Sequence, residues 1–134
     1  MAKITDEMKG IASKTKGFAL ATATKDGDPH VIPVGFGKVF SDDEVLLVDV
    51  FMKKALENIE ANPKVAVSVW DYDGLKGYEF KGIARIETSG NAFEDSVKMV
   101  KSVFPQFDAK AAVIVKVDSI YDVSAGPEAG KLVS

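Results

Sequence analysis

Two adjacent lysines, Lys53 and Lys54, stand where the sequence predicts the first turn of a helix. Helix starts usually carry Ser, Thr, Asp or Asn as the cap and acidic residues in the first turn. Here Val50, Phe51 and Met52 come before the lysines, so the free backbone N–H groups have no side-chain acceptor. A bound anion such as a phosphate would satisfy those N–H groups and the two cations together. The alternative is that both lysines are solvated and that water caps the helix, and the helix start by itself favours this alternative.

The residue inventory excludes several other kinds of site. The chain has 134 residues, no cysteine and one histidine, His30. Disulfides, thiolate chemistry and iron–sulfur clusters are therefore excluded, and a histidine-rich metal site cannot form. His30 follows a hairpin turn with no nucleophile pattern beside it, so a hydrolytic triad is not expected and we predict that His30 faces solvent or a partner chain. The acidic run 42–44 lacks the ligand spacing of a calcium loop and is predicted to be a turn.

The charge balance argues against nucleic acid as a partner. The net charge is −3, the isoelectric point calculated from the sequence is about 5.2, and the lysines are dispersed along the chain.

The first ten residues lack the apolar core of a signal peptide, and no apolar run reaches the length of a membrane span. We therefore expect a cytoplasmic protein that does not associate with membranes, folded as a single domain over residues 1–134.

The elements around the lysine pair can be predicted from the spacing of apolar residues. Residues 45–50 are typical of a buried strand, and the helix that begins after them ends at Asn62-Pro63. A capped amphipathic helix is predicted from Thr5 to near Gly17, and a second over 91–103. The other predicted strands are 18–24, 29–40, 64–70, 76–87, and 111–117 extended by 120–123. About six strands and three helices, dominated by antiparallel hairpins, predict a small β-barrel with helices packed outside it.

The predicted strand 29–40 has one face without large side chains. Its residues divide into two sets: Pro33, Gly35 and Gly37 on one face, and Ile32, Val34 and Phe36 on the other. A proline inside a strand marks an edge or a bulge, and the glycines would let a ligand approach the backbone closely. A barrel corner uses the same residue types, and the two interpretations are compatible.

Four aromatic residues, Phe36, Phe51, Trp70 and Tyr78, are individually typical of a core or a dimer interface. Several aromatic side chains in one neighbourhood would also flank a flat aromatic ligand.

The order and spacing of these segments resemble the pyridoxamine 5′-phosphate oxidase-like family of FMN-binding split β-barrels, and within it the small FMN-binding proteins. The resemblance covers residues 16–88, and the last helix and strand also fit. The segments that carry it are Phe18–Thr24, Asp26–His30, Val31–Phe36, Leu46–Asp49, Lys53-Lys54, Asn58-Ile59, Asn62–Val65 and Gly77–Gly82.

The resemblance implies a mainly β, α+β fold: a six-stranded antiparallel split β-barrel with two or three peripheral helices. It also implies a homodimer with two flavin sites at the subunit interface. In that family the strand equivalent to 33–36 contacts the flavin ring or ribityl chain, the strand end at 48–50 lies along the ring, and the basic pair binds the phosphate. With the resemblance added, we favour phosphate binding at Lys54. The FMN-binding residues implied are Pro33, Val34, Gly35, Val48, Asp49, Val50, Met52, Lys53 and Lys54, with Trp70 and Tyr78 near the ring, often from the partner subunit.

Two departures from the family pattern narrow the expected activity. Met52 and Ala55 stand where many relatives have Ser or Thr near the lysine pair, so fewer hydroxyls would reach a phosphate. No Trp or Arg follows Arg85, whereas true pyridoxamine phosphate oxidases end in a segment with both, so vitamin B6 oxidation is not expected.

We expect an FMN-dependent redox protein or oxidoreductase of unknown substrate. No catalytic acid or base and no metal are expected, and reduced nicotinamide or a redox protein is the candidate partner. The alternatives are a non-enzymatic flavin carrier or binding module, and a protein of the same fold that uses a deazaflavin or haem.

Overall fold

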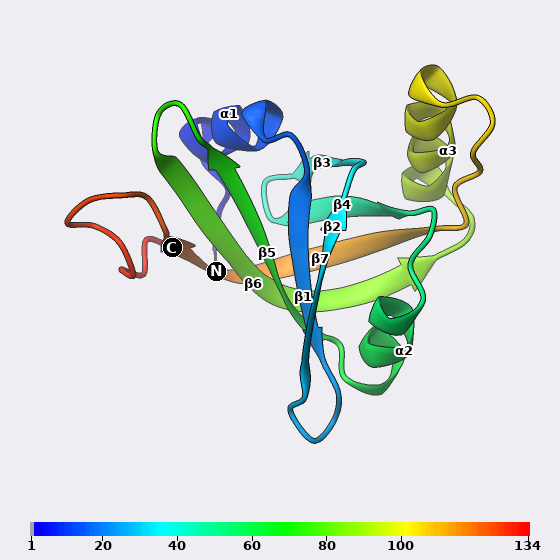
Figure 1. Ribbon diagram of the computed structural model, residues 1–134, viewed down its shortest axis with the longest axis horizontal. Coiled ribbons are helices and arrows are strands. Elements are labelled where there is room, and N and C mark those ends of the chain that lie inside the picture. The colour runs from blue at the N-terminus through cyan, green and yellow to red at the C-terminus, as the bar shows by residue number, and fades with distance from the viewer. Residues whose placement is uncertain (1) are drawn as a thin grey trace.

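The computed structural model describes residues 2–134, which form one curved antiparallel sheet with three helices around it (Figure 1). The strand order is β2-β1-β5-β6-β7-β4-β3, so β2 and β3 are the two edges. The elements are α1 (Asp6–Lys14), β1 (Phe18–Ala23), β2 (Pro29–Val34), β3 (Gly37–Ser41), β4 (Glu44–Asp49), α2 (Lys54–Ala61), β5 (Lys64–Asp71), β6 (Lys76–Glu87), α3 (Asn91–Val103) and β7 (Ala111–Asp122). The predicted class, a mainly β barrel with peripheral helices, is confirmed. None of the helices in residues 2–134 is long and apolar enough to cross a membrane.

The prediction of six strands was wrong by one, because the segment 29–40 forms two strands. β2 pairs with β1 as far as Val34, opposite Phe18, and β3 begins at Gly37, opposite Leu47 of β4. Residues 35–36 therefore carry the chain from one edge of the sheet to the other. A Cβ atom at Gly37 would lie 2.9 Å from the Leu46 carbonyl oxygen and 2.9 Å from the Phe18 ring, so this crossing needs glycine.

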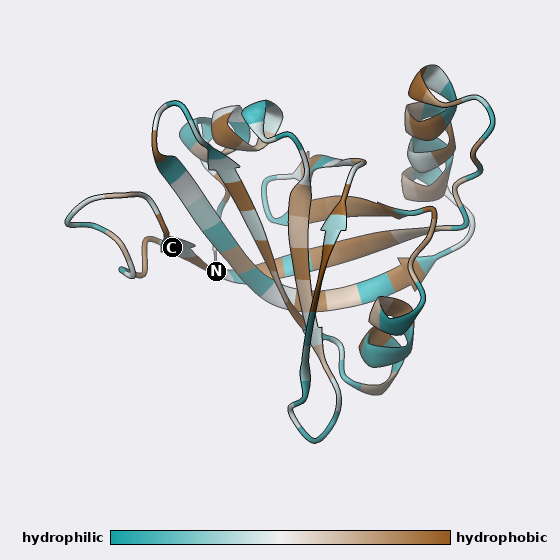
Figure 2. Ribbon diagram, viewed as in Figure 1, coloured by the Kyte–Doolittle hydropathy of each residue, from teal (hydrophilic) through white to brown (hydrophobic). Residues whose placement is uncertain are grey.

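The core has two layers, one on each face of β4. Inside the barrel, Val45 and Leu47 are fully buried in a cluster that includes Phe80 of β6. Outside the barrel, α3 covers β4 and β7, and its Val100 packs with Val48. Figure 2 shows this arrangement as largely hydrophobic strands β4 and β7 beside helices of mixed polarity. Burial on both faces explains why 45–48 is a continuous apolar run rather than an alternating one.

Helix α1 closes the barrel at the end where β5 turns into β6. Thr5 caps it, because the Thr5 hydroxyl accepts a hydrogen bond from the Met8 N–H at 3.3 Å. Met8 and Ile11 are buried in the barrel cluster. The predicted cap is confirmed, and the helix ends at Lys14, near the predicted Gly17.

Candidate functional site

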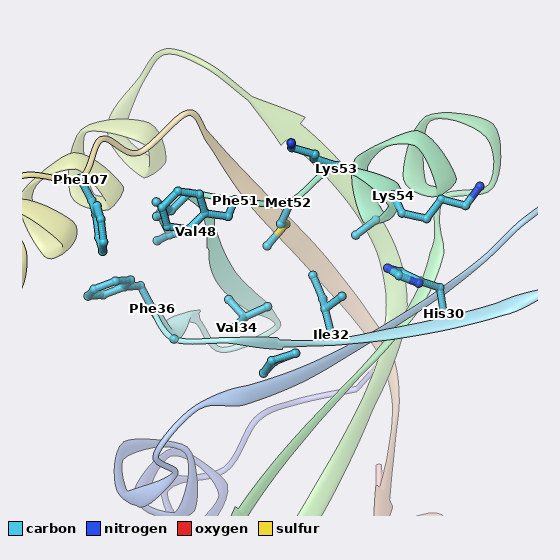
Figure 3. Close-up of a pocket in the computed structure, with 14 residues that line it drawn as sticks. His30, Ile32, Val34, Phe36, Val48, Phe51, Met52, Lys53, Lys54 and Phe107 are labelled. Carbon is cyan, nitrogen blue, oxygen red and sulfur yellow. The ribbon is translucent and has the colours of Figure 1, made fainter.

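A cavity of about 440 Å³ opens between β2 and the segment that joins β4 to α2. Its volume lies within the range of small-molecule sites, roughly 300–1,000 Å³. Figure 3 shows β2 along one side of the cavity and the segment before α2 along the other. The lining residues are His30, Ile32, Pro33, Val34, Gly35, Phe36, Val48, Val50, Phe51, Met52, Lys53, Lys54, Ala55 and Phe107.

One end of the cavity is basic. Figure 3 shows the His30 ring beneath the Lys54 side chain, while the amine groups of Lys53 and Lys54 point in different directions from the rim of the cavity. No carboxylate lines the cavity, and within residues 2–134 neither lysine forms an ion pair. Both lysines are exposed at the cavity rim, and their positive charges, which have no ion-pair partner among these residues, favour an anionic ligand.

The same end contains the start of α2. Lys53 occupies the cap position with φ −136° and ψ −71°, and no side chain bonds to the first turn. The prediction of an uncapped helix start is therefore confirmed. Farther along, the buried Ile59 anchors α2 in the barrel cluster, and the Asn58 amide donates a hydrogen bond to the Thr22 hydroxyl at 3.0 Å. The body of the helix is thus fixed while its N-terminus lies open at the cavity.

The other end of the cavity is apolar and aromatic. Phe51 and Phe107 meet edge to face, with ring centroids 5.2 Å apart and planes at 84°. Phe107 also lies 5.4 Å from Phe104, and the Phe104 ring lies 6.0 Å from that of Phe36. Phe51 is 69% exposed, so this wall presents an apolar ring to solvent. Such a surface suits a flat aromatic group, which gains dispersion contacts and loses hydrated area there.

Eight of the eleven site residues expected from the sequence line this cavity: Pro33, Val34, Gly35, Val48, Val50, Met52, Lys53 and Lys54. Their convergence comes from two elements, the end of β2 and the end of β4, which lie near each other because the chain switches edges after Val34.

Asp49, Trp70 and Tyr78 do not line the cavity. Asp49 lies behind the segment before α2, where its carboxylate accepts the Met52 N–H at 2.8 Å. Trp70 and Tyr78 lie on β5 and β6 near α1. Trp70 is 44% exposed, whereas Tyr78 is buried and its hydroxyl donates to Glu7. The expectation that these two residues approach a ring from the partner subunit stays a prediction.

The side chains that enter the cavity from β2 and from the residues just after it belong to the face opposite Pro33. His30, Ile32, Val34 and Phe36 point into it in Figure 3, whereas Pro33 belongs to the outward face and is exposed. Pro33 and Gly35 also line the cavity, and the expectation that a ligand approaches the backbone of this segment stays a prediction. Alternation along a strand relates these four residues, so the parity of Ile32 and Val34 was the signal that could have placed His30 in the site.

His30 and Phe107 are two of the lining residues that the sequence did not indicate. We expected His30 to face solvent or a partner, but it is only partly exposed and lies at the basic end. Phe107 comes from the segment between α3 and β7, more than 50 residues along the chain from Lys54. Nothing in the local pattern of that segment points to the cavity.

An open antiparallel barrel, with a cavity beside its edge strand that is basic at one end and aromatic at the other, defines a small split barrel. The chain belongs to the pyridoxamine 5′-phosphate oxidase family, whose model matches residues 4–124. It is 35% identical over 136 residues to an uncharacterised protein of Methanocaldococcus jannaschii, covering all of this chain and 90% of that one. The predicted resemblance is therefore confirmed.

Solved structures share the fold. HupZ of Group A Streptococcus is 28% identical, with a TM-score of 0.82 over 95% of this chain and 99% of that one. An FMN-binding protein from Syntrophomonas wolfei is 17% identical, with a TM-score of 0.76 over 90% and 89% of the two chains. Two further structures of this fold are named F420 reductase, at 20% identity and TM-score 0.66, and heme binding protein from Mycobacterium smegmatis, at 18% and 0.68. The match to the F420 reductase covers 84% of this chain and 94% of the reductase chain. The match to the heme binding protein covers 92% of this chain and 55% of the heme binding protein. The fold is thus shared by proteins named for different cofactors.

Proposed function

We propose that this protein binds FMN in the cavity between β2 and the start of α2 and acts as a small flavin-dependent redox protein. The observation that carries the proposal is the division of the cavity into a basic end and an aromatic end. FMN has the matching division, with a phosphate at one end and a flat ring system at the other. The FMN-binding protein of similar fold supports the same choice.

The residues at the basic end fit a phosphate. The free N–H groups at the start of α2 would donate to phosphate oxygens, and the helix dipole would favour the negative charge. Lys53 and Lys54 would add charge-assisted hydrogen bonds. Met52 and Ala55 offer no hydroxyl there, and His30, which enters the cavity from β2, is the remaining side-chain donor.

The residues at the aromatic end fit a ring that the protein holds without acid–base chemistry. Val34, Val48 and Phe107 are apolar, and they lie where they would cover the ring and exclude water. Polar contacts to the ring edge would come from backbone groups of the lining segments. The flavin would supply the redox chemistry, and these residues would supply position, burial and a low-dielectric environment. We propose no catalytic acid or base.

The open side of the cavity supports a homodimer with the flavin at the subunit interface. Phe51 at the cavity rim is 69% exposed, and Trp70 at the far end of the sheet is 44% exposed. In the proposed dimer, the partner's Trp70 would cover the part of the flavin ring that the FMN-binding chain leaves exposed. The electron donor would be reduced nicotinamide or a redox protein that reaches the remaining edge of the ring.

Three alternatives remain distinct from this proposal. A non-enzymatic flavin carrier would use the same cavity without turnover, and a deazaflavin also carries phosphate, so the basic end fits both. A haem would need an axial ligand, and His30 or Met52 would have to supply it within this cavity. Sustained oxidation of a reduced nicotinamide by the FMN-loaded protein would separate the redox protein from the carrier.

The visible absorption spectrum tests the ligand class. Purified protein is mixed with FMN, desalted and scanned, and parallel samples receive haem or a deazaflavin. We expect a retained flavin spectrum at about one FMN per chain. A protein that retains no FMN but keeps a haem or deazaflavin spectrum would contradict the proposal.

A further inference from the structure

The carboxylate of Asp49 lies directly behind the basic end of the cavity. Asp49 is the last residue of β4, and only 1% of its surface is exposed. Its Oδ1 accepts the Met52 N–H at 2.8 Å, and its backbone carbonyl accepts the Lys110 N–H at 2.7 Å. Asp49 therefore joins the segment before α2, which carries the lysine pair, to the segment that carries Phe107.

The carboxylate of Asp49 makes a hydrogen bond and no ion pair within residues 2–134. Burial raises the pKa of its carboxyl group, against the opposing effects of the Met52 N–H and the Lys110 charge. A buried, unpaired charge is unfavourable, so an aspartate here has to be explained by the hydrogen bond that it accepts.

We propose that Asp49 is a positioning residue for the anion end of the cavity: by holding the Met52 N–H, its side-chain oxygen fixes the turn that presents Lys53, Lys54 and the first amides of α2 to a phosphate. The inference rests on the proposed FMN function and deepens it. It assigns to Asp49 no contact with the ligand.

The geometry of the turn shows why one hydrogen bond matters there. Between the last ladder pair of β4, Asp49 opposite Ala111, and the first residue of α2, Lys54, the Met52 N–H is held by the Asp49 side chain, and the Lys53 carbonyl accepts the Glu57 N–H at 3.2 Å. Lys53 has non-helical backbone angles and no cap. Without the Asp49 acceptor, this four-residue connection would lose its hydrogen bond at Met52, and the position of Lys53 and of the first amides of α2 would be less fixed.

The chain contains a matched control at the other end of the same sheet. Asp122 is the last residue of β7, is 5% exposed, and its Oδ1 accepts the Ser124 N–H at 2.8 Å. Strand β7 runs from Ala111, opposite Asp49, to Asp122, opposite Tyr78, so the two carboxylates lie at opposite ends of one strand. Both carboxylates accept a backbone N–H shortly after a strand, Asp49 from the third residue after it and Asp122 from the second, but only Asp49 lies beside the cavity.

The test compares Asp49→Ala, Asp49→Asn and Asp122→Ala with the unchanged protein. FMN and riboflavin are titrated by quenching of flavin fluorescence, because the ratio of their dissociation constants isolates the phosphate. Hydrogen exchange of the Met52 amide is measured in the ligand-free protein by NMR. We expect Asp49→Ala to speed that exchange and to raise the FMN dissociation constant about tenfold, with riboflavin changed less than about twofold. Asp49→Asn keeps the acceptor oxygen and should keep the FMN-to-riboflavin ratio, and Asp122→Ala should also leave it unchanged.

Each other outcome contradicts a different statement. If the unchanged protein binds no FMN, the proposed function fails and this inference fails with it. If it binds FMN and Asp49→Ala leaves the ratio unchanged, only the inference on Asp49 is overturned. If Asp49→Ala does not fold, Asp49→Asn is the test. A change in the ratio of the FMN and riboflavin dissociation constants in that folded variant would overturn the inference, because it would show that the site needs the charge of Asp49 and not its acceptor oxygen.

Discussion

The two ends of the sheet differ in whether their charged side chains have protein partners. At the end where β5 turns into β6, charged groups have protein partners: Lys14 lies 3.7 Å from Asp71, Lys76 lies 4.0 Å from Glu7, and the Tyr78 hydroxyl donates to the same Glu7. At the end where β4 leads into α2, the basic groups around the cavity have no carboxylate beside them. The first end closes the barrel with its own side chains, whereas the second leaves donors free for a ligand.

The contrast shows that a buried aspartate that accepts a backbone N–H after a strand can serve two purposes. Asp49 and Asp122 each accept a backbone N–H just after a strand. At Asp122 the bond helps to hold the start of the C-terminal segment, and at Asp49 it shapes the turn before the lysine pair. The role of a buried aspartate therefore depends on what its turn presents, and not on the bond alone.

A substitution in the strands that connect the two ends should have the largest effect on stability, because it should destabilise both ends together. A Cβ atom at Gly82, beside the irregular pairing of β6 with β7, would collide with the Lys116 carbonyl group. We expect Gly82→Ala to lower the free energy of unfolding by about 3 kcal/mol, measured by urea denaturation. The control is Gly10→Ala in α1, where a Cβ meets open space and helix propensity should add up to about 1 kcal/mol. Equal stability of the two variants would show that the close approach at Gly82 is absent.

Removing one cation at the cavity end should affect only a ligand that carries phosphate. We expect Lys54→Ala to weaken FMN binding by roughly ten- to a hundredfold, because a charge-assisted hydrogen bond contributes about 1.5–3 kcal/mol. Riboflavin binding should be nearly unchanged in the same fluorescence titration. Lys25→Ala, which removes an exposed lysine from the β1–β2 turn, is the control for net charge. Equal weakening of FMN and riboflavin would contradict the phosphate assignment.

Removing Trp70 tests whether the far end of one chain belongs to the site of its partner. In the proposed dimer, Trp70→Ala should weaken FMN and riboflavin equally, by about three- to tenfold, because stacking contributes about 0.5–1.5 kcal/mol beyond area burial. The matched control is Tyr72→Ala, which removes another exposed aromatic residue from the β5–β6 turn. Unchanged dissociation constants for FMN and riboflavin in Trp70→Ala would show that Trp70 is not part of the FMN site, and that only the cavity end of the sheet contributes to it.

The smallest expected effect lies at the Tyr78 hydroxyl. Burial, and then the hydrogen bond and negative charge of Glu7, raise the pKa of Tyr78 from about 10 to about 12. The fold favours the neutral phenol, so this contribution to stability is fully present below pH 10 and is lost as the pH rises from 10 to 12. Tyr78→Phe should remove that decline, and FMN binding at pH 7 should not change. A Tyr78 that ionises near pH 10, followed by ultraviolet absorption, would contradict the buried environment.

Much of the fold could be predicted because local patterns and tertiary structure agree. The predicted range 91–103 matches α3, and 76–87 matches β6. The alternation of Phe18, Leu20 and Thr22 matches their burial against the more exposed alanines of β1. The split of 29–40 could not be predicted, because the residues on both sides of Gly35 continue one pattern while their ladder partners change from β1 to β4.

The basic end of the site was also readable, since Lys53, Lys54 and the missing cap are neighbours in sequence. The aromatic end was not, because Phe107 reaches the cavity only through the packing of α3 against β4 and β7. Asp49 was expected to contact the ligand, and the structure instead places its carboxylate behind the turn. A sequence pattern shows that a residue is near a site more readily than it shows which way its side chain points.

A crystal structure of the protein loaded with FMN would show where each end of the ligand binds. We predict the phosphate within hydrogen-bond distance of the Lys54 amide or side chain, and the ring against Val48 and Phe107. Clear density for FMN elsewhere on the chain, or with the phosphate at the aromatic end and the ring beside the lysines, would contradict it.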